Sequence, residues 1–370
     1  MAVWSNLKLN GSGIATLPFS SNCLNQKEVY HKEQIRDKAA GCGFELCGIA
    51  SPAPSPDISS YKRWTSAGFA AEMRYLTDHR VAIREDPRRL LPSTQSIICL
   101  GKVYNWPAPY TPEFTDGTRA WISRYAWGDD YHEVMRSGMT RLVGILLQEQ
   151  PFEYKICVDT APLLERSYAR LAGLGWIGRN TCLINQKLGS WIFLGEILTS
   201  LDLAPDTPPP DRCGTCRRCI DACPTEAIVP SGPNFTVDSR LCLSYLTIEH
   251  RGEIPEAQRE GNSTHIFGCD ICQDVCPWNR KAAATTDLHF APRLESPELE
   301  RLATLTEPEF RNLFRGTSIT RARYSGFLRN VAVAIGNSGN PNLRAPLEKL
   351  ARSEDQIVAD HARWALERLK

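Results

Sequence analysis

Eight of the chain's 14 cysteines lie between residues 213 and 276, at the spacings that iron–sulfur clusters require. The first run reads Cys213-Gly-Thr-Cys216-Arg-Arg-Cys219-Ile-Asp-Ala-Cys223-Pro224, and the second, after an isolated Cys242, reads Cys269-Asp-Ile-Cys272-Gln-Asp-Val-Cys276-Pro277. Runs of this type hold two [4Fe-4S] clusters in small bacterial electron carriers. The segment is therefore predicted to carry electrons through two clusters.

The spacing also predicts which thiolates share a cluster. Three cysteines at Cys-x-x-Cys-x-x-Cys spacing can wrap one cubane, whereas the next cysteine points to the neighbouring cluster. We expect one cluster on Cys213, Cys216, Cys219 and Cys276, and the other on Cys223, Cys242, Cys269 and Cys272. A zinc ribbon would leave Cys223 and Cys276 unused, and disulfides suit small secreted domains. The remaining cysteines are predicted to be core or incidental thiols: Cys23, Cys42, Cys47, Cys99, Cys157 and Cys182.

The composition is that of a globular protein. The 370 residues, 42% of them apolar and 23% charged, have room for two or three domains with a sizeable core. No apolar run is long enough to span a membrane, and residues 1–30 lack a signal-peptide core. A cytoplasmic protein is predicted, because thiols stay reduced there and can bind iron. Since the net charge is only +1, a nucleic-acid partner would have to be met by a local basic patch.

A layered α/β (α+β) domain is predicted over residues 28–204, after an N-terminal extension at 1–27. Apolar runs indicate strands at 44–50, 96–100 and 154–158, and helices are expected within 61–90, at 134–148 and at 161–172. The apolar runs 181–184 and 190–199 flank Asn185-Gln-Lys-Leu-Gly189 and predict a hairpin. A Pro-rich linker at 204–210 then leads into a cluster domain at 205–285.

The C-terminal part, residues 286–370, reads as a helical tail. Three helical patterns at 326–336, 343–352 and 357–369 are separated by tight turns, as in HEAT-type repeats. Between Phe310 and Leu347 the chain has no acidic residue but carries Arg311, Arg315, Arg321, Arg323, Arg329 and Arg344. Such a run is either a phosphate-binding surface or a solvated face.

The front domain is large enough to bind a final electron acceptor, but no cofactor motif identifies that acceptor. The glycines of Gly173-Leu-Gly175-Trp-Ile-Gly178 follow a predicted helix, whereas a dinucleotide fingerprint follows a strand. The radical S-adenosylmethionine spacing is missing, because Glu226 and Asn279 occupy the third-ligand positions. Asp130-Tyr-His132 begins the Asp-x-His-x-x-Gly motif of a histidine-ligated cobalamin site, but Met135 stands in the place of the glycine.

Several motifs together resemble the epoxyqueuosine reductase family. They are the cysteine runs, Ile122-Ser-Arg-Tyr-Ala-Trp-Gly-Asp-Asp-Tyr-His132, Val158-Asp-Thr-Ala-Pro162, Gly175-Trp-Ile-Gly-Arg-Asn180 and Arg329-Asn330. The resemblance covers nearly everything after residue 28. It implies a cobalamin-binding α/β domain, a ferredoxin-like domain and a HEAT-like tail. The implied enzyme uses cobalamin and two [4Fe-4S] clusters to reduce the epoxide of epoxyqueuosine, at the wobble position of transfer RNA, to the alkene of queuosine. It also implies no strong histidine ligand to the cobalt, in agreement with Met135.

The same resemblance implies the site residues. Asp159 matches the family's proposed proton donor, because a carboxylic acid in a dry pocket has a raised pKa and can protonate the departing oxygen. The alternative is that Asp159 caps the next helix. The corrin is expected to contact Ile122, Asp159, Asn180, Leu183, Leu194, Ser244, Cys269 and Asp270, although Ile122, Leu183 and Leu194 would equally suit a core. Transfer RNA is expected to contact His250, Arg251, Arg311, Arg315, Arg321, Arg323 and Arg329.

Two other interpretations stay open at the level of sequence. Reductive dehalogenases share cobalamin and two clusters, but they are typically exported and lack a basic helical tail. A non-catalytic electron carrier, or an RNA-binding iron–sulfur protein, would need no cobalamin. For the enzyme we expect an external electron donor of the flavodoxin or ferredoxin type, no membrane partner and a monomer.

Overall fold

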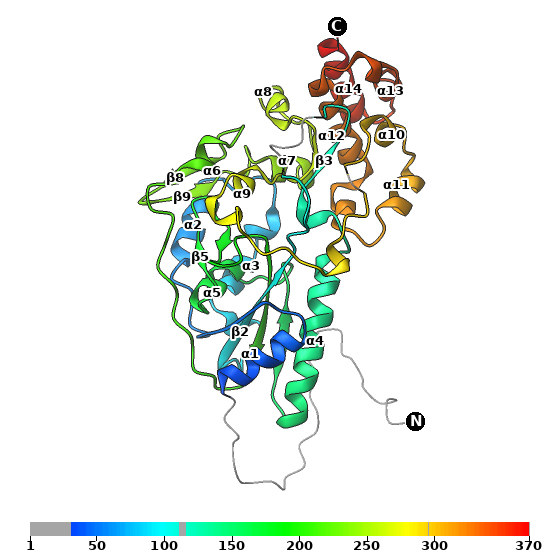
Figure 1. The fold of residues 1–370 in the computed structure, drawn as a ribbon. Helices are drawn as coiled ribbons and strands as arrows, with labels where there is room; N and C mark the ends of the chain where they lie inside the picture. Colours follow the sequence, from blue (N-terminus) through cyan, green and yellow to red (C-terminus); the bar gives the residue numbers. More distant parts are fainter. Residues whose placement is uncertain (1–30, 111–115, 295, 370) are drawn as a thin grey trace, which may run out of the picture.

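The computed structural model describes residues 31–110, 116–294 and 296–369. The predicted extension at 1–27, with Cys23, lies outside these residues. A four-stranded sheet in the order β1-β2-β7-β4 forms the centre of the front part of the chain (Figure 1). Its strands are β1 (Leu46–Ala50), β2 (Ser96–Val103), β7 (Ile192–Thr199) and β4 (Tyr154–Cys157), and every pairing is antiparallel.

Helices cover both faces of this sheet, because successive strand residues point to opposite sides. On one face Ile98 and Ile197 pack against α1 and α4. On the other face Ile97 and Leu198 pack against α5. The predicted layers are therefore observed, in their α+β form. The covering helices are α1 (Lys32–Gly41), α4 (Tyr131–Glu149) and α5 (Glu165–Leu171).

The predicted hairpin between 181–184 and 190–199 is wrong. A single bridge, from Asn185 to Gly189, joins the two runs in the structure. Strand β6 (Leu183–Ile184) pairs with β5 (Trp176–Ile177), whereas β7 enters the central sheet. The N–H of Ser190 donates to Asn279 Oδ1 at 2.7 Å, so a contact with the cluster segment redirects the chain directly after the turn.

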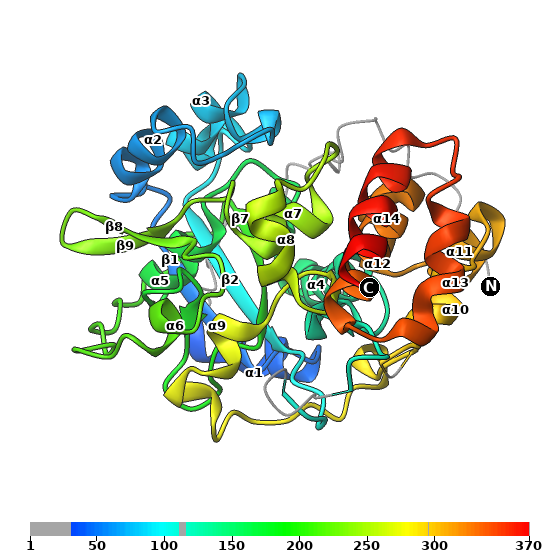
Figure 2. The same ribbon diagram turned by 90° about the horizontal axis from the view of Figure 1, so that it is seen from above.

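The cysteine-rich segment consists of short elements. They are α6 (Arg218–Asp221), β8 (Ile228–Ser231), β9 (Asn234–Val237), α7 (Leu243–Ile248), α8 (Glu256–Arg259), β10 (His265–Phe267) and α9 (Ile271–Asp274). Strands β8 and β9 form an antiparallel hairpin on the side of the molecule away from the C-terminal helices (Figure 2). Strand β10 pairs in parallel with β3 (Trp121–Ile122), so a shared ladder joins this segment to the front part.

The remaining helices lie before β2 and after the cluster segment. Between β1 and β2 the chain forms α2 (Ile58–Ser66), the 3-10 helix η1 (Arg74–Leu76) and α3 (Arg80–Glu85). The C-terminal part contains α10 (Leu299–Ala303), α11 (Glu307–Leu313), η8 (Ser318–Ala322), α12 (Arg323–Ser338), α13 (Arg344–Leu350) and α14 (Gln356–Arg368). Helices α12 to α14 match the three predicted patterns. No helix in the described ranges is long and apolar enough to cross a bilayer.

Arg329 fixes the C-terminal part to the cluster segment. Its side chain is 0% exposed, and it donates to the carbonyl oxygens of Leu246, His250 and Gly252 at 2.6–3.0 Å. Asn330, the next residue, is also fully buried. The prediction that Arg329 contacts RNA is wrong, because backbone carbonyls inside the protein occupy its guanidinium.

Candidate active site

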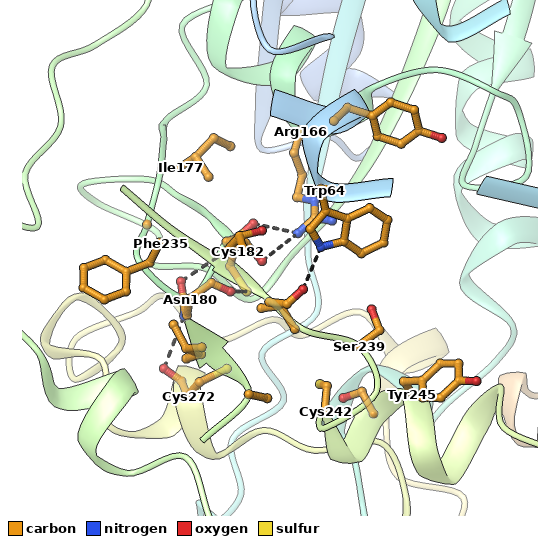
Figure 3. A pocket seen from close by; sticks show the side chains of 18 of the residues that line it. Trp64, Arg166, Ile177, Asn180, Cys182, Phe235, Ser239, Cys242, Tyr245 and Cys272 are labelled. Atoms are coloured by element: carbon orange, nitrogen blue, oxygen red, sulfur yellow. Dashed lines mark hydrogen bonds between the residues drawn. The ribbon is translucent and has the colours of Figure 1, made fainter. Parts of the chain in front are cut away.

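A large cavity is lined by residues of the sheet domain and the cluster segment (Figure 3), and Arg321 of the C-terminal part also lines it. Its volume is about 1710 Å³, above the roughly 300–1,000 Å³ typical of sites for small ligands. Aromatic and apolar side chains supply much of its wall: Trp64, Tyr75, Tyr125, Tyr131, Trp176 and Ile177. Such a wall suits a large, flat and mostly apolar group.

The two predicted cysteine sets lie at different places. Cys223, Cys242, Cys269 and Cys272 line the cavity. Of the other set, Cys213 and Cys276 pack beside Trp176 and Trp278. Burial, followed by the charges of Cys276, Cys213 and Cys216, raises the pKa of Cys219 to about 11. The fold therefore places Cys276 near Cys213, Cys216 and Cys219, whereas the other predicted set lies at the cavity wall.

The alternative of a disulfide framework is not observed, since every cysteine in the described ranges is free. Cys42, Cys99 and Cys157 are buried, as predicted, and Cys47 packs against the core. Cys182 is not a simple core thiol, because it lines the cavity and contacts Cys272.

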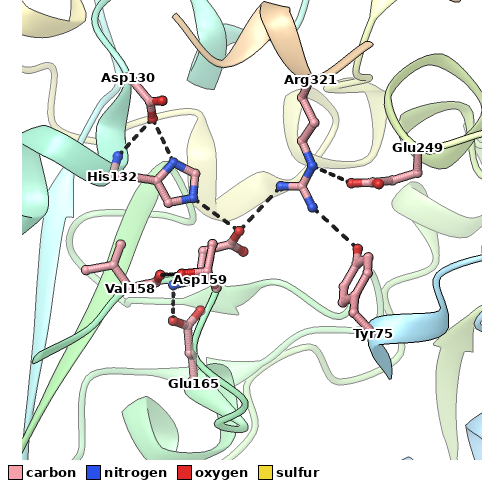
Figure 4. Close-up of polar contacts among 9 residues, drawn as sticks. Tyr75, Asp130, His132, Val158, Asp159, Glu165, Glu249 and Arg321 are labelled. Atoms are coloured by element: carbon pink, nitrogen blue, oxygen red, sulfur yellow. Dashed lines mark hydrogen bonds and ion pairs between the residues drawn. The ribbon is translucent and has the colours of Figure 1, made fainter. Parts of the chain in front are cut away.

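Asp159 follows β4 and contributes to the cavity wall (Figure 4). Its Oδ2 lies 3.2 Å from His132 Nε2 and 3.4 Å from Arg321 Nη1. Its backbone φ is 49°, in the left-handed region that residues other than glycine rarely adopt. The helix-cap alternative is wrong, because α5 begins at Glu165 and its N-cap residue is Leu164.

His132 is held between two carboxylates. Asp130 caps α4 by accepting the backbone N–H of His132, and its Oδ1 also lies 2.7 Å from His132 Nδ1. Burial lowers the pKa of His132, but the hydrogen bonds to Asp130 and Asp159 outweigh burial and raise the pKa to about 9. At neutral pH the imidazole is therefore protonated, and both ring nitrogens donate.

The pKa of Asp159 is lowered, so the prediction of a raised pKa is wrong. Burial alone raises this pKa, but the hydrogen bond from His132 and the charges of Arg321 and His132 have the larger combined effect. The Asp159 side chain is also 38% exposed to the open cavity. Asp159 is therefore ionised at neutral pH, and a neighbouring proton sits on His132.

Arg321 belongs to this ion network. Its Nε lies 2.6 Å from Glu249 Oε1, and its Nη2 lies 3.4 Å from the Tyr75 hydroxyl. The structure thus places Arg321 beside Asp159, with its charge already balanced by two carboxylates. Because the Arg321 side chain is still 38% exposed, its contact with RNA stays a prediction.

The other predicted RNA contacts differ in their exposure and in the contacts they make within the protein. Arg311, Arg315 and Arg323 are exposed, and Arg311 pairs with Glu307 at 2.5 Å. The guanidinium of Arg251 donates to the carbonyl oxygens of Ile248, Arg321 and Ala322 at 2.9–3.2 Å. His250 lies next to it, with Nε2 2.8 Å from the Glu253 carbonyl oxygen. Arg251, and the carbonyl oxygen of His250 that accepts from Arg329, therefore join the cluster segment to the C-terminal part.

Four of the predicted corrin contacts line the cavity: Asp159, Asn180, Ser244 and Cys269. Ile122, Leu183 and Leu194 lie in apolar cores, as the alternative for them predicted. Asp270 is buried, and its carboxylate accepts from the Ser123 hydroxyl at 2.5 Å and from the Arg124 N–H at 2.7 Å. Asp270 therefore ties the second cysteine run to the segment after β3.

Sequence reasoning assigned no role to His132, Glu165, Tyr75 or Glu249. A signal for His132 was available, because an aspartate at the N-cap can accept a hydrogen bond from the residue two positions later. No local signal joins Arg321 to Asp159, which is 162 positions away in the chain.

Family models match two parts of the chain. Residues 84–160 match "Epoxyqueuosine reductase QueG, DUF1730", and residues 212–279 match a "4Fe-4S double cluster binding domain". The epoxyqueuosine reductase of Xanthomonas campestris is 41% identical over 344 residues, which cover 90% of this chain and 94% of the relative. That of Pseudomonas aeruginosa is 39% identical over 349 residues, which cover 91% and 94%.

Solved structures agree with these relatives. The epoxyqueuosine reductase of Streptococcus thermophilus matches with a TM-score of 0.83 and 31% identity, over 91% of this chain and 90% of that chain. An epoxyqueuosine reductase solved with a tRNA-Tyr epoxyqueuosine-modified stem loop matches with a TM-score of 0.75 and 26% identity, over 91% and 98%. The chain therefore belongs to the epoxyqueuosine reductase family, as its motifs predicted.

Proposed function

We propose that this chain reduces the epoxide of epoxyqueuosine in transfer RNA to the alkene of queuosine. Family membership makes it an oxidoreductase. The observation that carries the proposal is the shared cavity, which Asp159 lines together with Cys223, Cys242, Cys269 and Cys272. A source of electrons and a group that handles protons therefore face the same space. A simple electron carrier would need no such cavity.

The cofactors are the two [4Fe-4S] clusters and the cobalamin that the motifs predicted. The cavity fits a corrin, because it is large and has aromatic walls. No histidine is among the described residues that line it. Asn180, Ser244 and Cys269 would contact the macrocycle. When bound, cobalamin supplies the electrons that reach the epoxide carbon.

The cavity also suggests an order for the clusters. Cys223, Cys242, Cys269 and Cys272 would hold the inner cluster, since these residues line the cavity. Cys213, Cys216, Cys219 and Cys276 would hold the outer cluster. Electrons from an external donor of the flavodoxin or ferredoxin type would then pass from the outer cluster to the inner one.

Asp159 and His132 would deliver a proton to the departing oxygen. Conversion of an epoxide to an alkene and water breaks both C–O bonds and consumes two electrons and two protons. Asp159 would pass a proton to the departing oxygen, and the His132 imidazolium would replace it across the 3.2 Å contact between Nε2 and Oδ2. Arg321 keeps the carboxylate in place between reactions. Bound corrin and RNA would bury Asp159 further, which raises its pKa and favours this transfer.

Transfer RNA would lie across the junction of the cluster segment and the C-terminal part. Arg311, Arg315 and Arg323 are exposed and would meet phosphates, together with His250 and Arg251 of the cluster segment. The relative solved with a modified stem loop supports this class of partner. We assign the corrin domain to 28–204, the ferredoxin-like domain to 205–285 and the HEAT-like tail to 286–370, in a cytoplasmic monomer.

Asp159→Asn tests the proposal, because it keeps the side-chain shape but removes the acid. Conversion of epoxyqueuosine, measured by mass spectrometry of digested nucleosides, should fall by about 100-fold or more. Iron content, cobalamin content and RNA affinity should stay unchanged. Asp360→Asn is the matched control, since Asp360 pairs with Arg363 on the far helix α14. Near-normal conversion by Asp159→Asn would assign the proton to another group.

A further inference from the structure

The strained backbone of Asp159 needs a contact that holds it. Its φ of 49° lies in the left-handed region, which aspartate enters more readily than most residues but which still costs free energy that surrounding contacts must offset. The loop is tight, since the N–H of Thr160 donates to the Val158 carbonyl oxygen at 2.5 Å. The side-chain contacts of Asp159 act on its carboxylate and leave its backbone N–H to be satisfied separately.

Glu165 satisfies that N–H. Its Oε1 accepts the hydrogen bond from the Asp159 backbone at 2.5 Å (Figure 4). Glu165 is the first residue of α5, and Tyr168 and Ala169 of this helix are 0% exposed against the sheet. Because the helix is anchored, the accepting oxygen has a fixed position, and the loop is fixed with it.

The surroundings of Glu165 keep it neutral. Asp159, His132 and Arg166 face it from the loop, α4 and its own helix. Glu196 of β7 faces the same side of the sheet, where it is 0% exposed and has no partner among the described residues. Burial, followed by the charge of Asp159, raises the pKa of Glu165 to about 8. At neutral pH Glu165 therefore accepts the N–H without repelling the Asp159 carboxylate.

We propose that Glu165 is a positioning residue that locks the Asp159 loop in the conformation needed to deliver a proton. The inference rests on the proposed role of Asp159. Glu165 does not touch the substrate in this scheme, and it acts only through the backbone of Asp159.

Glu165→Ala and Glu165→Gln separate the role of the accepting oxygen from that of the charge. Glu165→Ala removes the acceptor, so turnover should fall by about 10- to 100-fold, with iron, cobalamin and RNA affinity unchanged. Glu165→Gln keeps a carbonyl oxygen at the same reach and should restore turnover to within about threefold of the parent. Glu45→Ala is the control, because Glu45 Oε2 accepts the Val103 N–H at 2.8 Å away from the cavity, and its turnover should not change.

The pH profile gives a readout that a purely structural role would not move. The parent should lose turnover as Glu165 ionises near pH 8, whereas Glu165→Gln should keep turnover until His132 deprotonates near pH 9. Full turnover in Glu165→Ala, or equal loss in Glu165→Gln and Glu165→Ala, would overturn the inference. Normal conversion by Asp159→Asn would instead assign the proton to another group, whereas no conversion by the parent would overturn the proposed function, so the failures are distinguishable.

Discussion

Arg321 Nη1 lies 3.4 Å from Asp159 Oδ2, although the two residues are 162 positions apart in the chain. The contact joins the C-terminal part directly to the carboxylate that faces the cavity. Together with the hydrogen bond from His132, the Arg321 charge outweighs burial and lowers the pKa of Asp159, which makes Arg321 distinct from the arginines around it.

Arg321→Gln and Arg323→Gln should therefore behave differently. Loss of the Arg321 charge should raise the apparent pKa of Asp159 in the pH–rate profile and reduce turnover at saturating RNA by about tenfold. Arg323 is exposed, so its loss should weaken RNA binding and lower the salt slope by about one, with turnover at saturation unchanged. Filter binding across salt concentrations measures the RNA affinity and its salt slope, and single-turnover kinetics measure the turnover at saturating RNA. If the two variants changed only affinity, Arg321 would be an ordinary phosphate contact.

Paired cysteine substitutions check the cluster ligands. The parent should contain about eight iron atoms per chain, and Cys219→Ser or Cys276→Ser should each remove about four. The double variant should lose no more iron than either single variant, because both thiolates serve one cluster. Cys223→Ser combined with Cys276→Ser should lose both clusters. Iron analysis and electron paramagnetic resonance spectra measure the cluster content. If the Cys219/Cys276 double variant lost both clusters and the Cys223/Cys276 double variant lost only one, Cys276 would belong to the cluster of Cys223.

Arg329→Ala should destabilise the whole protein. It leaves the carbonyl oxygens of Leu246, His250 and Gly252 buried without their donor, and each such loss costs about 1–3 kcal/mol. The free energy of unfolding should therefore fall by about 3 kcal/mol or more in urea titrations. Arg311→Ala removes an exposed pair with Glu307 and should cost less than about 0.5 kcal/mol. Similar small effects for both variants would contradict the structural role of Arg329.

His132 makes stability depend on pH. Its pKa is raised from 6.5 to about 9 in the folded chain, so its stabilising contribution is complete below pH 6.5 and is lost as the pH rises through 9. The parent should lose on the order of 1–3 kcal/mol of unfolding free energy from pH 6.5 to 10 through this group. His132→Gln should flatten that part of the curve in urea titrations. An unchanged slope would mean that His132 is neutral in the folded protein.

The sequence by itself determined the chemistry of the cluster segment. Cysteine spacing is a local property of the chain, and a cubane fixes how many residues may separate its ligands. The helices of the C-terminal part and the layers of the front part also followed from local periodicity. The family motifs then identified the reaction, because they combine residues from every part of the chain.

Only the tertiary structure decided the state of Asp159 and the roles of the arginines. The central sheet is antiparallel, and Asp159 reaches the cavity from the loop after β4, so its place depends on that loop. Its acidity depends on His132 and Arg321, which local sequence does not place nearby. Likewise, Arg321, Arg323 and Arg329 look alike in the sequence, yet one is paired with acids, one is exposed and one is buried. Charge and burial are set by neighbours brought together on folding, and the spacing of residues along the chain does not record them.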